Sequence, residues 1–412
     1  MLEMLFSSFF IALIKKWCLV VNFMPLMLIY LFLKITDSGE MIKLILTLLS
    51  IWLMMMMILT VSDKEQNIVL LILMGFLMWS LQVSFYSDSL LTFYLGFEMS
   101  VLPVLFIILG WGYQPDRLEA GFYMILYTVF FSLPLLMMIM SKFYLKLFIN
   151  DLVLWMFMLA FFVKLPMFGV HLWLPRAHVE APVYGSMILA GIMLKLGGYG
   201  MIQVIYKFND KFIFNCNILI VYSLLGGIFL SLICFMQSDM KMLIAYSSVV
   251  HMSLVLSGIL TLRETGLLGS LCVMVGHGFC SSGLFYLLGI YYSRVHSRSF
   301  YINQGLLSSM SISFLWWFLF CSANLSFPPS LSLVGEILLM VSIITWLKKS
   351  FFILCFLNFF SSMYSIYLYA FCCHGQQGLI FSLKSVKLKE LMISFFHWVP
   401  LNILILDLSL FQ

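Results

Sequence analysis

Charged residues are scarce in this chain. Asp, Glu, Lys and Arg make up 9% of its 412 residues, whereas 63% are hydrophobic. A globular domain is usually about one quarter charged and about half apolar. The shortage of charge excludes an ordinary soluble fold. The chain is therefore expected to be an integral membrane protein that binds no nucleic acid.

Cysteine motifs and nucleotide-binding motifs are missing as well. The nine cysteines have no CxxC spacing, and most lie singly inside apolar runs, so they are interpreted as small buried hydrophobic residues. The chain has no GxxxxGK[ST] motif, and its glycine-rich stretches GHGFCS and GGYGMIQ lack the third glycine of a dinucleotide-binding loop. We therefore expect the chain itself to hold no metal, nucleotide or redox cofactor.

The apolar runs also lack the alternating polarity of barrel strands, so the segments that cross the membrane are expected to be α-helices. A window of about 19 residues, which spans a hydrocarbon core of about 30 Å, finds apolar runs almost from end to end. The sequence predicts an all-α polytopic membrane protein with about fourteen transmembrane helices. They are expected near residues 2–14, 17–34, 43–61, 67–84, 90–110, 119–141, 150–174, 183–206, 212–236, 242–261, 266–292, 306–347, 351–372 and 391–411.

Two of these spans are interrupted by proline close to a charged residue. In FFVKLPMFGVHLWLP, Pro166 removes a helix donor just after Lys164, and in SANLSFPPSLSLVGE the pair Pro328 and Pro329 breaks the span before Glu336. Broken helices at corresponding places in two halves of a membrane protein indicate an internal repeat with ion sites at the breaks. Within one membrane domain, 1–412, we therefore expect N-terminal helices (1–66), a first repeat (67–206), a second repeat (212–372), and a connecting segment with a C-terminal helix (373–412).

Four ionisable residues lie deep in apolar runs: Glu98, Lys164, Lys195 and Glu336. Each costs about 2.5–3.5 kcal/mol at the centre of a membrane helix, so pairing or hydration must offset its burial. Glu98 and Lys164 are the natural first pair, although a single residue could instead snorkel to an interface or make a static contact. Moving a charged partner away would switch such a site between holding and releasing a proton, as a proton pathway requires.

Histidines fill the sequence between these charges. Imidazole can donate and accept at once, so with water and serine hydroxyls it can relay protons. For His277, flanked by glycines, a relay role is favoured over packing, and for His178 and His251 the two interpretations are balanced. His171 precedes His178 beside the first break, and Lys241 stands near the start of a span, where snorkelling is favoured over a relay role.

Six stretches of the chain resemble one known family. They are FEMSVLPVLFIILGWG, FVKLPMFGVHLWLPRAHVEAP, ILAGIMLKLGGYG, SDMKMLIAYSSVVHMS, GHGFCSSGLF and ANLSFPPSLSLVGE. The antiporter-like membrane subunits of respiratory complex I are similar in all of them, and HLWLPRAHVEAP with LKLGGYG is the most specific part. The resemblance implies two inverted five-helix repeats, each with a broken helix, in a subunit that translocates protons.

The resemblance also implies a role for individual residues. Glu98 and Lys164 would be the gating ion pair, and Lys195 the central proton carrier. His251 and His277 would belong to a hydrated relay that ends at Glu336. Glutamate at this last position, where other antiporter-like subunits carry lysine, resembles one particular subunit of the complex.

Cofactors, partners and location follow from the same resemblance. FMN, iron–sulfur clusters and ubiquinone would belong to other subunits, and electron transfer from NADH to ubiquinone there would drive the pump. The partners would be lipids and other complex I membrane subunits, including neighbouring antiporter-like ones. The location would be the mitochondrial inner membrane, or alternatively a bacterial plasma membrane. Two other functions stay open: a cation/proton antiporter subunit without redox partners, and a structural membrane subunit without transport.

Overall fold

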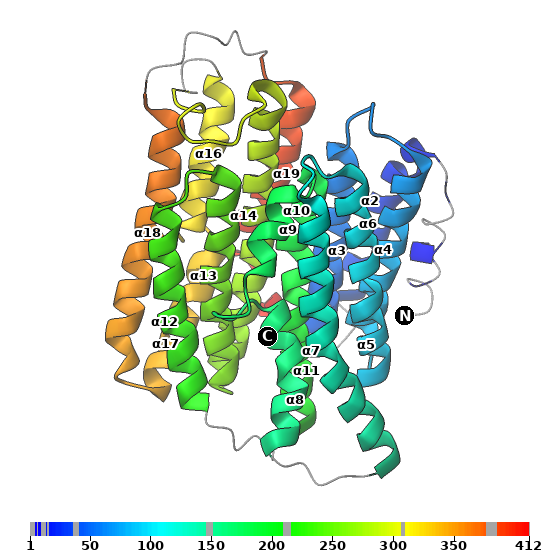
Figure 1. Cartoon of the computed structure of the whole chain (residues 1–412), viewed down its shortest axis with the longest axis vertical. Coiled ribbons are helices and arrows are strands. Elements are labelled where there is room, and N and C mark those ends of the chain that lie inside the picture. The colour runs from blue at the N-terminus through cyan, green and yellow to red at the C-terminus, as the bar shows by residue number, and fades with distance from the viewer. Residues whose placement is uncertain are drawn as a thin grey trace. The chain divides into compact units, whose positions relative to one another are not determined.

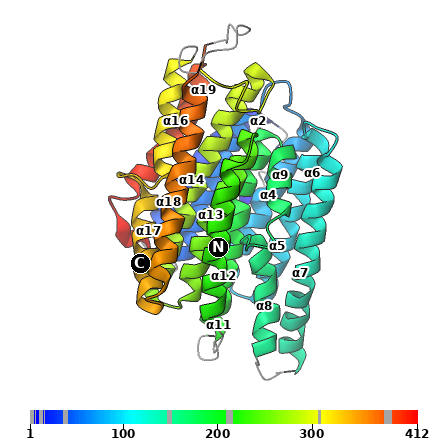
Figure 2. The same cartoon turned by 60° about the vertical axis from the view of Figure 1, so that its left-hand side comes forward.

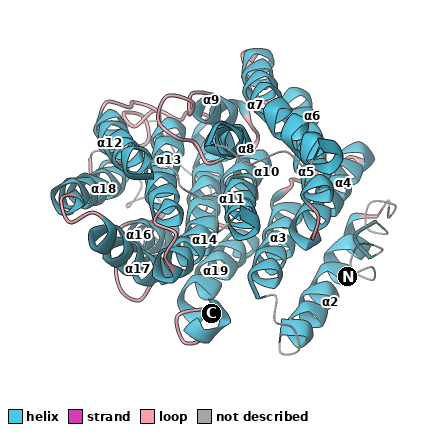
Figure 3. Cartoon of the chain, turned by 90° about the horizontal axis from the view of Figure 1, so that it is seen from below, coloured by secondary structure: helices cyan, strands magenta, loops and turns pink. Residues whose placement is uncertain are grey.

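The computed structural model describes residues 5, 7–9, 14, 16–35, 41–145, 151–208, 216–305, 310–375 and 385–411. Over these ranges the chain is helical and contains no strand, which confirms the all-α prediction (Figure 3). Most of the predicted span 2–14, and much of the predicted connecting segment that begins at 373, lie outside these ranges.

The chain divides into two compact units (Figure 1). Unit 1 comprises Met1–Asn215 with Leu410–Gln412, and unit 2 comprises Cys216–Ser409. The helices of unit 1 are α2 (Trp17–Ile35), α3 (Met41–Thr60), α4 (Ile68–Tyr86), α5 (Leu90–Met99), α6 (Val101–Trp111), α7 (Arg117–Leu145), α8 (Asp151–Lys164), α9 (Trp173–Glu180), α10 (Val183–Ile188), the π-helical turn η1 (Leu189–Met193) and α11 (Leu194–Phe208). Those of unit 2 are α12 (Cys216–Phe235), α13 (Met240–Leu260), α14 (Glu264–Val295), α16 (Ser311–Asn324), α17 (Leu331–Trp346), α18 (Ser350–Cys373) and α19 (Leu388–Ile403), and a 3-10 turn, η3 (Leu408–Phe411), ends the chain.

The observed helices follow the predicted spans closely. Nine helical segments in the described ranges are long and apolar enough to cross a membrane, and each coincides with a predicted span. The predicted span 17–34 is α2, and the two interrupted spans contain α8 with α9 and α16 with α17. The last prediction was too long, because α19 ends at Ile403 and the side chain of Asp407 then accepts a hydrogen bond from Ser409 N at the start of η3.

The first break forms where Pro166 cannot donate a backbone hydrogen bond. Helix α8 therefore ends at Lys164, and Met167 N donates instead to Phe162 O over 3.0 Å. The indole Nε1 of Trp173, the first residue of α9, donates to Val163 O over 3.0 Å. A side chain of the following helix thus supplies a hydrogen bond to the carbonyl of the residue before the last one in α8.

The second break repeats this arrangement. Helix α16 ends at Asn324, and the hydroxyl of Ser332 in α17 donates to Ala323 O over 2.7 Å. Ala323, like Val163, is the residue before the last one in its helix. Buried backbone groups are costly to leave without partners, and at each break the following helix supplies one to this carbonyl.

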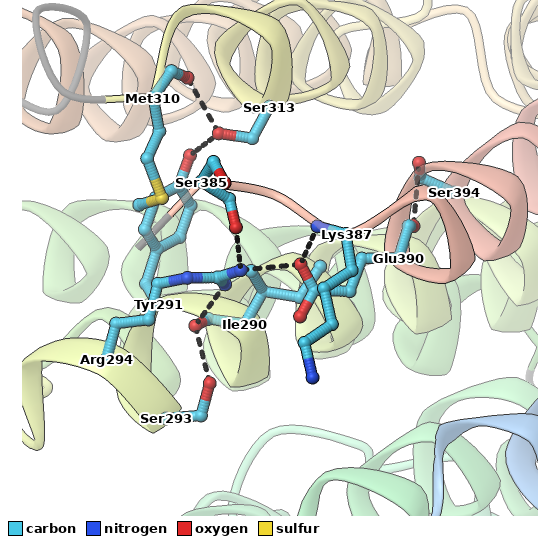
Figure 4. A network of polar contacts seen from close by, with 10 residues as sticks. All are labelled: Ile290, Tyr291, Ser293, Arg294, Met310, Ser313, Ser385, Lys387, Glu390 and Ser394. Atoms are coloured by element: carbon cyan, nitrogen blue, oxygen red, sulfur yellow. Dashed lines mark hydrogen bonds and ion pairs between the residues drawn. The ribbon is translucent and has the colours of Figure 1, made fainter. Parts of the chain in front are cut away.

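Helices of unit 2 are joined both by packing and by a polar contact at the end of α14. Helix α14 packs against α13, α16, α17 and α19 (Figure 2). At the end of α14 the guanidinium of Arg294 donates to Glu390 Oε2 over 2.6 Å and to Ser385 O over 3.3 Å (Figure 4). Glu390 Oε2 also accepts from Lys387 N over 3.0 Å, so one carboxylate caps α19 and ties it to α14.

Close helix packing at Gly197 should limit what this position can hold. A Cβ added there would lie 2.8 Å from Leu165 N, a backbone atom at the first break. We expect Gly197→Ala to destabilise the protein by about 1–3 kcal/mol through overpacking. Thermal unfolding of the purified protein measures the effect. Gly110→Ala is the matched control, because nothing lies within 4 Å of its added Cβ, and equal unfolding midpoints for the two variants would contradict the prediction.

Candidate functional site

Glu98 and Lys164 lie close together in unit 1 without a direct hydrogen bond. Lys164 is 1% exposed at the end of α8, and its ammonium lies 4.2 Å from the centroid of the Phe97 ring. Neither Lys164 Nζ nor Glu98 Oε1 has a hydrogen-bond partner in the described part of the chain. The two charges act on each other electrostatically, and Ser132 of α7 faces the Glu98 carboxyl. The two residues of the predicted pair thus lie near each other but are not joined by a hydrogen bond.

Glycine packing places both members of this pair. Gly96, two residues before Glu98, fits against α4, because an added Cβ would lie 2.7 Å from Ser84 N. Gly197 of α11 lies against Lys164 in the same way, with an added Cβ 3.0 Å from Lys164 Cβ. The glycines of the LKLGGYG stretch therefore bring α11, and with it Lys195, to the end of α8.

Lys195 is fully buried and follows a π-helical turn. Its Nζ donates to Ala190 O over 2.5 Å, a carbonyl within η1. In a π-helix the backbone bonds run from residue i to i+5, and such single turns often occur at functional sites in α-helices. This carbonyl is a neutral partner, so the bond to it does not require Lys195 to stay charged.

His171 and His178 lie beside the first break, as the sequence predicted. His171 Nδ1 accepts from Gly169 N over 3.3 Å, and its ring stacks on Phe168 at 5.6 Å. His178 is fully buried in α9. Arg176, in the same helix, forms a surface ion pair with Glu119 and covers the Tyr123 ring.

The predicted residues of unit 2 form a second cluster. His251 Nδ1 lies 3.5 Å from Glu336 Oε1, and the His251 ring centroid is 5.6 Å from that of His277. The hydroxyl of Tyr364 in α18 lies 3.2 Å from His251 Nε2. An imidazole with a polar partner on each nitrogen can accept a proton on one side and release one on the other.

Close packing of α14 on α17 builds this cluster. An added Cβ would lie 3.1 Å from Ser332 N at Gly276 and 2.8 Å from Val273 N at Gly335. Each glycine directly precedes an ionisable residue, His277 in α14 and Glu336 in α17. The small residues beside the charged ones therefore let the two helices approach closely.

Lys241 does not snorkel to the surface as expected, since it is 2% exposed. Its backbone N donates to Asp239 Oδ1 over 3.0 Å, which caps α13. Burial raises the pKa of the Asp239 carboxyl, and that bond together with the positive charges of Arg298 and Lys241 partly offsets the rise. Neighbouring opposite charge explains how Lys241 tolerates burial at this helix end.

Some functional residues were missed from the sequence. Tyr364 was one of many aromatic residues in an apolar run, and the π-helical turn before Lys195 has no distinctive sequence signal. No group of three or more His, Cys, Asp or Glu residues in the described ranges could hold a metal ion. The chemistry that the two clusters can perform is proton transfer between carboxylate, amine, imidazole and phenol groups.

A family model and individual relatives of known name match this chain, and both point to the same family. The family described as NADH:quinone oxidoreductase/Mrp antiporter, TM, matches residues 87–363. The chain is 49% identical over 379 residues to a protein of Ceratitis capitata named NADH-ubiquinone oxidoreductase chain 4, covering 88% of this chain and 84% of that protein.

Solved structures share the fold at low sequence identity. A chain of respiratory complex I from Thermus thermophilus superposes with a TM-score of 0.86 at 19% identity, covering 97% of this chain and 94% of the other. A chain of the Mrp complex from Dietzia sp. gives a TM-score of 0.77 at 18% identity, covering 88% of this chain and 42% of the other.

The unlocked pair predicts how the chain tolerates loss of both charges. Replacing a buried ion pair by uncharged groups of similar volume is often neutral or stabilising by about 1–4 kcal/mol. We expect the double variant Glu98→Gln/Lys164→Met to assemble with an unfolding midpoint at or above that of the unaltered complex. Lys164→Met alone should be less stable than the double variant, because it leaves the Glu98 charge uncompensated. A double variant less stable than both single variants would contradict this interpretation.

Proposed function

The chain belongs to the family of membrane subunits shared by NADH:quinone oxidoreductases and Mrp antiporters, and from that premise we propose that its two ionisable clusters carry protons. The chain is a proton-translocating, antiporter-like subunit of NADH–ubiquinone oxidoreductase, the respiratory complex I. The chain groups with the relatives named chain 4. The glutamate at position 336 agrees with this grouping.

The observation that most supports this proposal is the buried Lys164 ammonium, which lies near Glu98 without a hydrogen bond to it. Closing the distance between the two would favour both charged forms, and opening it would favour proton release from the lysine. Because the break after Lys164 interrupts the backbone ladder of α8, a small shift there can change the distance. The pair would therefore act as a gate.

Lys195 would carry the proton that the gate controls. Its partner Ala190 O is neutral, so the energy of the charged lysine depends on charges that approach or leave nearby. Lys164 is such a charge, since α11 contacts the end of α8 through Gly197. An unpaired Lys164 ammonium would repel a second positive charge and help Lys195 to release its proton.

The cluster in unit 2 would receive and pass on protons. His251 can take a proton at one ring nitrogen and release one from the other, between Glu336 and Tyr364. His277 lies beside it as a second imidazole, and Glu336 would be the terminal site. Supporting roles would fall to Lys241 in unit 2 and to His171 and His178 beside the first break in unit 1.

We also propose that residues 67–206 and 212–372 are two repeats. Each range holds five spans, and in each the fourth span is the broken one: α8 with α9, and α16 with α17. At both breaks the following helix donates a side-chain hydrogen bond to the same carbonyl position, from Trp173 to Val163 and from Ser332 to Ala323. Shared order and shared hydrogen bonding support a duplicated unit.

The rest of the complex would supply the driving reaction. FMN, iron–sulfur clusters and ubiquinone would lie in other subunits, and this chain would hold no cofactor or nucleotide. Its neighbours would be further antiporter-like membrane subunits and lipids, in the mitochondrial inner membrane. A bacterial plasma membrane is the alternative location. Nearly half of the aligned residues are identical to those of the Ceratitis capitata protein named NADH-ubiquinone oxidoreductase chain 4, over most of its length, which favours complex I over a separate cation/proton antiporter.

Replacing the carrier lysine by arginine tests its chemistry. The guanidinium stays charged at all relevant pH values, so Lys195→Arg keeps the charge but cannot release a proton. We expect an assembled complex that moves fewer protons per NADH oxidised, measured in sealed vesicles with a pH-sensitive dye. Lys348→Arg is the control, because that lysine lies in the loop after α17. An unchanged ratio for Lys195→Arg would overturn the carrier role.

The double variant Glu98→Gln/Lys164→Met separates transport from a structural role. If the pair is a gate, the assembled variant should oxidise NADH with reduced proton movement, even though its stability is retained. Glu119→Gln is the control, because the surface pair with Arg176 contributes only about 0–1 kcal/mol. Full pumping by the double variant would favour a structural subunit.

A further inference from the structure

One face of α11 carries polar residues at every fourth position, from Lys195 to the end of the helix. They are Lys195, Tyr199, Gln203 and Lys207. Residues four apart are neighbours on a helix surface, and twelve residues of helix extend over about 18 Å. The face therefore leads from the fully buried Lys195 to Lys207, which is exposed at the last turn.

At its outer end this face meets a charged group between two other helices. Lys207 Nζ donates to Asp88 O over 2.6 Å, and Lys43 forms an ion pair with the Asp88 side chain. The Asp88 side chain is 69% exposed, in the short connection between α4 and α5. Lys43 thus holds the carboxylate and Lys207 the backbone carbonyl of Asp88, so the outer end of the face is a polar group in contact with water.

The middle of the face is already hydrogen-bonded. Gln203 Nε2 donates to the Tyr199 hydroxyl over 2.6 Å, and that hydroxyl donates to Phe85 O over 2.9 Å. The Tyr199 ring also packs edge-on against Phe85 at 5.5 Å. Tyr199 is buried in contact with α4, one helical turn from Lys195, so its hydroxyl is the polar group of this face that follows Lys195.

An unsatisfied glutamine lies on α4 beside this contact. Gln82 is fully buried, and neither its Nε2 nor its Oε1 has a hydrogen-bond partner in the described ranges. It precedes Phe85 by three residues, so it lies on the adjoining face of α4, one turn further into the membrane. A buried amide with no protein partner is normally satisfied by water. Gln82 therefore marks a hydrated position beside the α4–α11 contact.

We propose that Asp88, Gln203, Tyr199 and Gln82 form the route by which protons reach Lys195 from the membrane surface. A proton would pass along water to the Tyr199 hydroxyl oxygen, while the hydroxyl turns from Phe85 O and releases its own proton to the next water. The phenol is neutral before and after the transfer. Gln203 and Gln82 orient the water by donating and accepting, and they are not protonated themselves. The final acceptor is the neutral Lys195 amine, so this inference rests on the carrier role proposed above.

Tyr199→Phe and Gln82→Met test the route. The first keeps the ring packing and removes only the hydroxyl, and the second replaces the amide by an unbranched apolar side chain of similar length. Both variants should assemble normally. In sealed vesicles the initial rate of NADH-driven proton movement should fall several-fold in each. Tyr291→Phe is the matched control, because its buried hydroxyl pairs with Ser313 within unit 2 and belongs to none of the groups of the route, so its loss should leave the rate unchanged.

The outcomes separate this route from the carrier role. A normal rate in Tyr199→Phe or in Gln82→Met, together with a defect in Lys195→Arg, would overturn the route and leave the carrier role intact. A normal ratio in Lys195→Arg would overturn both. If Tyr199→Phe fails to assemble, Gln82→Met decides the question, since loss of an unbonded amide should not destabilise the fold.

Discussion

The burial of charge in apolar helices is the constraint on which the rest of this structure depends. Lys164 and Lys195 are almost entirely shielded from solvent. Within the described ranges the Lys164 ammonium has no hydrogen-bond partner, and the Lys195 ammonium donates to a backbone carbonyl. Lys164 is stabilised by an aromatic face and by the field of Glu98, and Lys195 by a backbone carbonyl. Each of these interactions is weak enough to change when a neighbour moves. Proton transfer requires a buried charge of this kind, which is stabilised but not fixed by a strong ion pair.

Glycine makes this arrangement possible. At Gly96, Gly197, Gly276 and Gly335 a neighbouring backbone atom lies where a side chain would begin. Each of these glycines is within two residues of an ionisable group, so the closest helix contacts and the charged residues coincide. In a lipid environment helix association depends on such close packing, because apolar side chains gain little by leaving lipid. The same residues thus hold the bundle together and set the distances between the charges.

The broken helices of both units have the same kind of hydrogen bond at the break. The helix ends before a proline, and a side chain from the next helix donates to the carbonyl of the residue before the last one in the broken helix. At the first break an amine lies near a carboxylate without a hydrogen bond to it, and near the second a carboxylate lies beside an imidazole. The hydrogen bonding at the two breaks is therefore the same, whereas the ionisable groups beside them differ. This difference is expected if one unit releases protons and the other accepts them.

The sequence by itself determined the membrane location, the all-helical fold, the positions of both breaks and the identity of the buried charged residues. These properties follow from composition, hydropathy and the missing donor of proline, which are local. Only the tertiary structure decided that Glu98 and Lys164 are close but not bonded, that Tyr364 contacts His251, and that a π-helical turn precedes Lys195. It also revealed that Lys241 is buried and that Gln82 and Tyr199 lie on facing helices. These features depend on contacts between segments up to 114 residues apart, such as that of Tyr199 with Phe85, and no local pattern encodes which of many apolar or aromatic residues will meet across helices.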